Sequence, residues 1–352
     1  MGGGLLCLAL TLMPAGCTSP AEGDATADPG GGPSWITYRS GDGEVVLEIG
    51  PVDLPAGAGH DAIEQPAPRV GALPVGGWVR GYDLELVDRA GQPVPRRVLH
   101  HANLMTPGRR ELFSPIMQRI GAAGSETGSV KLPRLLGYRM QRGDSLLVTS
   151  MFHNPTSQSY EGVRLRVRMR WVPEGARLRP LSIEPFYVDA TPPVGPHSFH
   201  LPPGRSERSW EGVPVVSGRI LALAGHLHDH AVELRFENVT RSEVVWNSSP
   251  VLDQAGRVAR MPQSFFLHRL GVKLHAGETY RLTAVYENPT DTLIPDGGMG
   301  ALGGIMLPGR GMPWPAVDRA HPDYLEDMRR TLAGAHGAEL PAGGMVEHTH
   351  SH

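Results

Sequence analysis

A passage of sixteen residues occurs twice in this chain with the same pattern. Residues 141–156 read QRGDSLLVTSMFHNPT and residues 275–290 read HAGETYRLTAVYENPT. Each copy has a glycine-acid turn, a run of alternating apolar residues typical of a β-strand, an aromatic residue, and the exit x-Asn-Pro-Thr. Because internal repeats mark repeated structural units, this agreement predicts two copies of one β-domain.

The rest of the chain also favours strands. Its 352 residues include 45 glycines and 33 prolines, and apolar residues at helical spacing are scarce. Residues 163–169 alternate apolar side chains with arginines, as expected of a strand with one wet face. The sequence predicts an all-β fold of two consecutive antiparallel, jelly-roll-like β-sandwich domains, residues 35–188 and 189–315. The best helical candidates are residues 109–124 and a helix in the C-terminal segment 316–352.

The N-terminus predicts export. Residues 1–17 read as a secretory signal, and PAGC resembles a bacterial lipoprotein box in which Cys17 is lipidated. Residues 18–34 are rich in Gly, Pro, Ala and Asp and read as a disordered tether. We therefore expect a periplasmic or cell-surface protein, anchored by lipid at Cys17 and without disulfides. The net charge of −3 argues against a nucleic-acid partner.

Histidines at every second position suggest a metal site in the second half. His226 and His228 precede a strand-like segment, and side chains at i and i+2 of a strand point to one face. His230 continues the alternation and is interpreted as a surface residue. Met299 lies among glycines, where there is little core to fill, and a thioether combined with imidazoles suits copper. Met306 is the alternative sulfur ligand, although its apolar strand favours a role in the core.

The first half offers a second histidine set. His100 and His101 are adjacent in one predicted strand, and His153 lies at the Asn-Pro exit of another. Neighbours on an ideal strand face opposite ways, so His100 and His101 can share an ion only where the strand twists or bulges. The repeat places His153 where the second copy has Glu287.

This order of His-His, His before Asn-Pro, His-x-His and Met resembles the copper type II, ascorbate-dependent monooxygenases. That family includes peptidylglycine α-hydroxylating monooxygenase and dopamine β-monooxygenase, which have two β-sandwich domains. The resemblance implies two copper ions, a reductant such as ascorbate, and hydroxylation of a C–H bond of a small substrate by O2. It implies an electron-transfer site at His100, His101 and His153, and a catalytic, oxygen-binding site at His226, His228 and Met299.

Two other functions remain open from the sequence. One is a copper-binding or delivery protein without catalysis on the same fold. The tail MVEHTHSH favours it, because His348, His350 and His352 form a short tract of the kind that captures Cu(II), Ni(II) or Zn(II). The other is an extracellular scaffold in which the histidines are incidental.

Overall fold

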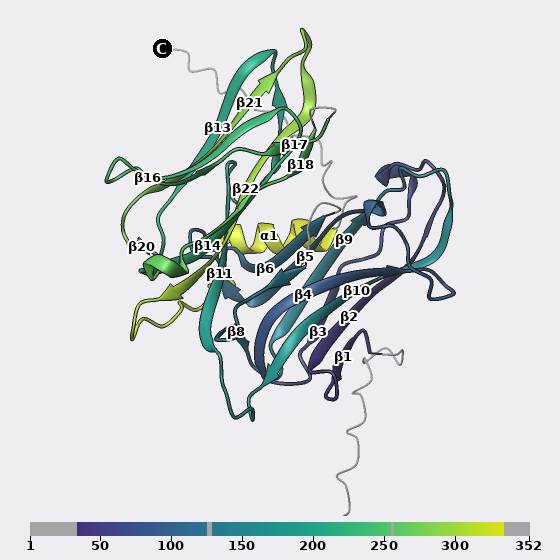
Figure 1. Ribbon diagram of the computed structural model, residues 1–352, viewed down its shortest axis with the longest axis horizontal. Helices are drawn as coiled ribbons and strands as arrows, with labels where there is room; N and C mark the ends of the chain where they lie inside the picture. The colour runs from purple at the N-terminus through teal and green to yellow at the C-terminus, as the bar shows by residue number, and fades with distance from the viewer. Residues whose placement is uncertain (1–33, 125–128, 255–256, 334–352) are drawn as a thin grey trace, which may run out of the picture. The chain divides into compact units, whose positions relative to one another are not determined.

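The computed structural model describes residues 34–124, 129–254 and 257–333. Within these residues the chain forms 22 β-strands, one α-helix and three 3-10 helices, which confirms the predicted all-β class. The 3-10 helices are η1 (His60–Ala62), η2 (Arg96–Val98) and η3 (Leu267–Arg269). The strands build two sandwiches within one compact unit (Figure 1).

The first sandwich consists of two sheets. One has the strand order β1-β2-β10-β4-β8-β11, with β7 beside β4; the other has the order β3-β9-β5-β6. The first of these sheets contains β1 (Ile36–Arg39), β2 (Glu44–Leu54), β4 (Gly77–Val87), β7 (Val130–Lys131), β8 (Leu136–Met140), β10 (Tyr160–Pro173) and β11 (Leu181–Asp189). The second contains β3 (Arg69–Ala72), β5 (Leu99–Arg110), β6 (Met117–Gly124) and β9 (Ser145–Phe152).

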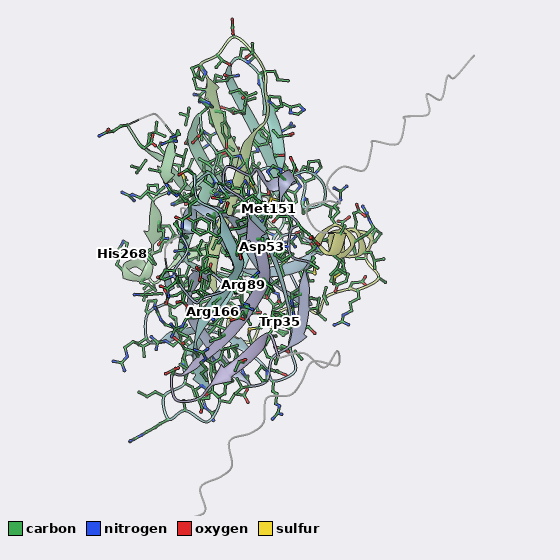
Figure 2. The ribbon with its side chains drawn as sticks, turned by 90° about the vertical axis from the view of Figure 1, so that its right-hand side faces the viewer. Trp35, Asp53, Arg89, Met151, Arg166 and His268 are labelled. Atoms are coloured by element: carbon green, nitrogen blue, oxygen red, sulfur yellow. The ribbon has the colours of Figure 1, made fainter. Side chains whose placement is uncertain are left out.

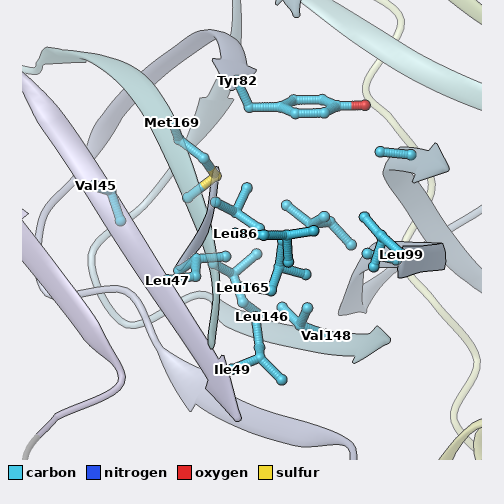
Figure 3. Close-up of a cluster of buried hydrophobic side chains, with 14 of the residues drawn as sticks. Val45, Leu47, Ile49, Tyr82, Leu86, Leu99, Leu146, Val148, Leu165 and Met169 are labelled. Carbon is cyan, nitrogen blue, oxygen red and sulfur yellow. The ribbon is translucent and has the colours of Figure 1, made fainter. Parts of the chain in front are cut away.

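Side-chain alternation forms the first core. Every second side chain of β10 from Val163 to Met169 is buried, and these side chains meet others from both sheets (Figure 3). The arginines between them lie on the outer face; one of them is Arg166, labelled in Figure 2. Its Nε lies 2.8 Å from a carboxylate oxygen of Glu48 of β2. The predicted strand with one wet face is therefore a central strand of this sheet.

The second sandwich also has two sheets. β11 pairs with β22, β22 with β14, and β14 with β19, while β12 and β20 add to β22 and β14; the facing sheet has the order β13-β21-β15-β16. Their bounds are β12 (Ser198–Leu201), β13 (Gly204–Gly212), β14 (Gly218–Leu227), β15 (Ala231–Asn238), β16 (Glu243–Ser248), β19 (Gln263–Phe265), β20 (Val272–Leu274), β21 (Tyr280–Asn288) and β22 (Ile294–Pro308). β17 (Val251–Leu252) and β18 (Val258–Arg260) form a separate ribbon.

One sheet runs through both sandwiches. β11 pairs in parallel with β8 of the first sandwich and antiparallel with β22 of the second. The domain boundary predicted between residues 188 and 189 falls inside β11, where the sheet is continuous. Residues Trp35–His352 cluster as one unit, so that boundary stays a prediction.

The repeated passage forms the same corner twice. Asn154 Oδ1 accepts hydrogen bonds from the amide and hydroxyl of Thr156 at 3.1 and 2.7 Å. Asn288 Oδ1 accepts the same pair from Thr290 at 2.9 and 2.7 Å. Both asparagines are buried and donate their side-chain amides to main-chain carbonyls. The shared sequence therefore ends β9 and β21 with one hydrogen-bonded motif.

The helix predicted over residues 109–124 is wrong, because this segment contains the end of β5 and the whole of β6. Its apolar side chains enter different clusters: Phe113 joins the second core, Met117 contacts the cluster around Tyr324, and Ile120 packs on the first core. The apolar residues of this segment have the spacing of one helical face, but the segment is extended and passes from one core to another. The α-helix of the described residues, α1 (Pro322–Ala333), lies where the C-terminal helix was predicted.

No helix of the described residues is long and apolar enough to cross a membrane. The predicted signal, residues 18–33 of the predicted tether and the lipidation site at Cys17 lie outside the described residues, as do His348, His350 and His352.

Candidate functional site

His100, His101 and His153, here called the first histidine group, lie where β5 and β9 run side by side. The register of β5 against β9 shifts between Leu99 and His101, so His100 occupies a β-bulge. A bulge breaks the strict alternation of side chains. The sequence argument required this distortion if adjacent histidines were to face one ion.

The rings of this group gather around His100. Its ring centroid lies 5.2 Å from that of His101 and 5.3 Å from that of His153, and both pairs are steeply tilted. A metal–nitrogen bond is about 2.0–2.1 Å long and the ring centre lies roughly 1.1 Å behind the nitrogen. Two imidazoles on one tetrahedral ion therefore have centres about 5 Å apart. The ring separations fit that spacing.

Polar contacts orient the rings from behind. His153 Nε2 donates to the carbonyl oxygen of Arg97 at 2.7 Å, which makes Nδ1 the nitrogen with the lone pair when the ring is neutral. The side-chain amide of Asn103 lies 3.4 Å from His101 Nδ1. Hydrogen bonds of this kind hold metal-binding histidines in position in other proteins.

Two residues beside this group were missed from the sequence. The ring centroid of His60, in η1, lies 6.1 Å from that of His100. Met151 lies directly opposite His101 in the β5–β9 register and is labelled in Figure 2. His60 stands alone in a loop without a motif, and Met151 reads as one more apolar residue of a strand. The pairing of distant segments is what reveals them.

The second histidine group is the name used here for His226 of β14, Met299 of β22 and His228, which directly follows the last residue of β14. β14 and β22 pair His226 with Ala301 and Leu227 with Gly300, and His228 and Met299 are the next residues along the two segments. Ala301 and Met299 lie on the same face of β22, and His226 lies opposite Ala301, so the backbone places His226 and Met299 on one face. The two imidazole centroids lie 5.3 Å apart, nearly perpendicular.

A buried tyrosine hydroxyl joins the two strands of this group. Tyr286 Oη accepts hydrogen bonds from the main-chain amides of His228 at 3.1 Å and Met299 at 3.0 Å. The same hydroxyl donates to the carbonyl oxygen of Met299. Its phenol is fully buried, and burial raises the pKa of Tyr286 to about 12. Tyr286 therefore fixes the backbone on which His228 and Met299 stand.

The His228 imidazole is uncharged at neutral pH. Burial, together with the nearby His226 and His100 rings, lowers the pKa of His228 to about 4, while the Asp229 carboxylate and the Gly297 backbone oppose that change. Histidine binds metals in this neutral form.

Other predicted candidates lie elsewhere. Met306 is fully buried in the second core, where it pairs with Ile220 and Glu184. It lies seven residues beyond Met299 on β22 and so about 23 Å along the strand. His230 has a left-handed backbone with φ of 69°, which ends the alternation begun at His226.

The imidazoles of the first histidine group do not converge on one point as they stand. Among the described residues, no three His, Cys, Asp or Glu side chains form a group that could hold a metal ion. A cavity of about 620 Å³ is lined by residues such as Asp53, Gln65 and Arg89, and by none of the six predicted ligands. Each pair of neighbouring rings thus has a separation that suits one shared metal ion, but the side chains would have to rotate for all of them to bind the same ion.

The comparisons with known proteins do not support the predicted family. No family model and no curated protein matches this chain. Among solved structures, PNGase F, a glycosylasparaginase from Flavobacterium meningosepticum, has 12% identity and a TM-score of 0.41, covering 78% of this chain and 98% of its own. The major capsid protein P2 from bacteriophage PM2 has 13% identity and a TM-score of 0.34, covering 76% and 99%.

The predicted membership of the copper type II monooxygenases is therefore wrong. The two solved structures reported above are a glycosylasparaginase and a capsid protein, and the predicted oxidoreductase and monooxygenase activity is wrong together with the family. The ready-made site that this family implied at His100, His101 and His153 is also not formed by these side chains as they lie. The resemblance rested on short pieces such as His-His and Asn-Pro, and the Asn-Pro-Thr pieces prove to be structural corners.

Proposed function

We propose that the protein binds transition-metal ions at its two histidine groups. The observation that carries this proposal is the spacing of the rings, with centroids 5.2 and 5.3 Å apart in the first group and 5.3 Å apart in the second. Exposed or half-exposed imidazoles at this spacing need only side-chain rotation to share an ion. No oxygen chemistry is part of this proposal.

The donor types favour copper among the metals to test. The first group offers three imidazoles and the second offers two imidazoles and a thioether. A thioether is a soft ligand that suits copper, whereas carboxylates and carbonyls suit magnesium and calcium. The uncharged state of His228 at neutral pH supports binding, because no proton has to be displaced there.

The test is a metal titration of the full chain with the tail histidines His348, His350 and His352 replaced by alanine. That background is needed because the tail is expected to bind copper by itself. We expect about two bound copper ions per chain at neutral pH. His100→Ala should remove one and His228→Ala the other, because each deletes a central imidazole. His268→Ala, in η3, is the matched control and should keep both.

Two results would contradict this proposal. One is a chain without the tail histidines that binds no copper, zinc or nickel. The other is binding that survives the double replacement of His100 and His228. Thermal unfolding with and without metal gives an independent readout, because an ion that binds the folded state raises the melting temperature.

Export and lipid anchoring belong to the same proposal. An anchor at Cys17 would hold the histidine groups outside the cytoplasmic membrane. Replacing Cys17 with alanine should release the protein from the membrane fraction of the expressing bacterium. A protein that stays in the membrane fraction would argue against this anchor.

A further inference from the structure

The segment that carries His60 is bonded tightly to the strand end that carries His153. The amide of Gly57 donates to Thr156 O at 2.9 Å, and the amide of Asn154 donates to Ala58 O at 2.7 Å. The buried side-chain amide of Asn154 also donates to Pro55 O at 2.9 Å. These bonds hold the start of the loop against the corner that follows His153.

Gln65 closes the other end of the same loop. Its Oε1 accepts the amide of Phe152 at 2.7 Å, and its Nε2 donates to the carbonyl of Phe152 at 2.9 Å. The same Nε2 donates to the carbonyl of His60 at 2.9 Å. One side chain therefore links the main chain of His60 to the residue just before His153.

The His60 ring is oriented as well as placed. Its Nε2 lies 3.1 Å from Asp61 Oδ1, a carboxylate contact that favours a proton on Nε2 and a lone pair on Nδ1. The ring centroid is 6.1 Å from that of His100. This is about 1 Å beyond the spacing of two imidazoles on a tetrahedral ion. About half of the side chain is exposed, so rotation can close that gap.

We infer that His60 is the fourth imidazole of the first histidine group and that Gln65 is its positioning residue, an inference that rests on the proposed metal binding. Four nitrogen donors fill a tetrahedral coordination shell and leave no position for water or substrate. The first group is then a closed site that holds an ion. The second group, with three donors, keeps an open position.

The experiment isolates the first group by adding His228→Ala to the chain that lacks the tail histidines. Cu(II) affinity is measured by competition with a chelator, and the number of imidazole ligands by X-ray absorption. His60→Ala should weaken binding at least tenfold and lower the imidazole count from four to three. Added free imidazole should restore part of the affinity, which a purely structural role would not produce.

Gln65→Ala should weaken binding with His60 still present, and free imidazole should help it in the same way. His275→Ala is the control and should match the parent. If His100→Ala abolishes binding while His60→Ala changes neither affinity nor ligand count, the inference about His60 is wrong and the metal site stands. If His100→Ala leaves binding intact, the proposed metal site and the inference both fall.

Discussion

A buried ion pair fixes α1 to the first sandwich. Arg119 of β6 and Asp327 of α1 lie 2.5 Å apart, with side chains that are 14% and 6% exposed. Asp327 Oδ2 also accepts the amide of Met117 at 3.0 Å. Replacing Asp327 with alanine would leave the Arg119 guanidinium buried without its carboxylate and the Met117 amide without its acceptor.

The expected cost follows from that geometry. Breaking a buried pair on one side destabilises a protein by about 3–5 kcal/mol, because a charge stays buried and unpaired. For a unit of this size, such a loss lowers the melting temperature by roughly 6–10 °C. The double variant Arg119→Met with Asp327→Leu should recover much of the loss, because it removes both charges and keeps the volume.

Urea unfolding at neutral pH, followed by circular dichroism, measures the change. Glu326→Ala is the matched control on the same helix, because Glu326 pairs with Arg329 and Arg330 in solvent. Exposed pairs contribute little, so this variant should unfold like the parent. If Asp327→Ala also unfolds like the parent, the reasoning about a buried pair is refuted.

Two further predictions concern buried polar groups. Burial raises the pKa of Glu111 to about 7 from 4.5, against the hydrogen bonds that its carboxylate accepts. The folded state therefore holds the proton more tightly than the unfolded chain does, and stability should fall by on the order of 3 kcal/mol between pH 4.5 and 7. Glu111→Gln should remove this contribution to the pH dependence of the free energy of unfolding, measured by urea unfolding at several pH values. A pH dependence equal to that of the parent would argue against this explanation. Tyr286→Phe should cost about 2–4 kcal/mol, because two main-chain amides lose their acceptor. Tyr280→Phe, which strands one amide, should cost less, and equal losses would contradict the argument.

The strands and corners could be predicted because their causes are local. Alternation places the buried face of β10, and the turn glycines of the two repeats, Gly143 and Gly277, both have the left-handed backbone that glycine tolerates, with φ of 88° and 81°. The Asn-Pro-Thr exits make their bonds within a few residues. Such features need no knowledge of distant partners.

The helix and the full site could not be predicted, because their causes are distant in the chain. Phe113 and Ile120 are nearly two helical turns apart in sequence, yet they pack on different cores. His60 reaches His100 because hydrogen bonds of Gln65, Gly57 and Asn154 join its loop to the end of β9 and the corner after it. The bulge at His100 results from the pairing of β5 with β9. From the sequence, a bulge could be named only as a requirement for His100 and His101 to share an ion.

The repeat explains the scaffold but not the location of the histidine groups. The first group uses the end of β9, whereas the equivalent position of β21 is Glu287, and the second group lies on β14 and β22 instead. The step before that position is Phe152 in one copy and Tyr286 in the other, both fully buried. The hydroxyl that distinguishes Tyr286 from Phe152 is the atom that binds the backbone of His228 and Met299. The hydroxyl oxygen of Tyr286 thus supports the second histidine group, and Phe152, at the same position of the first copy, has no such oxygen.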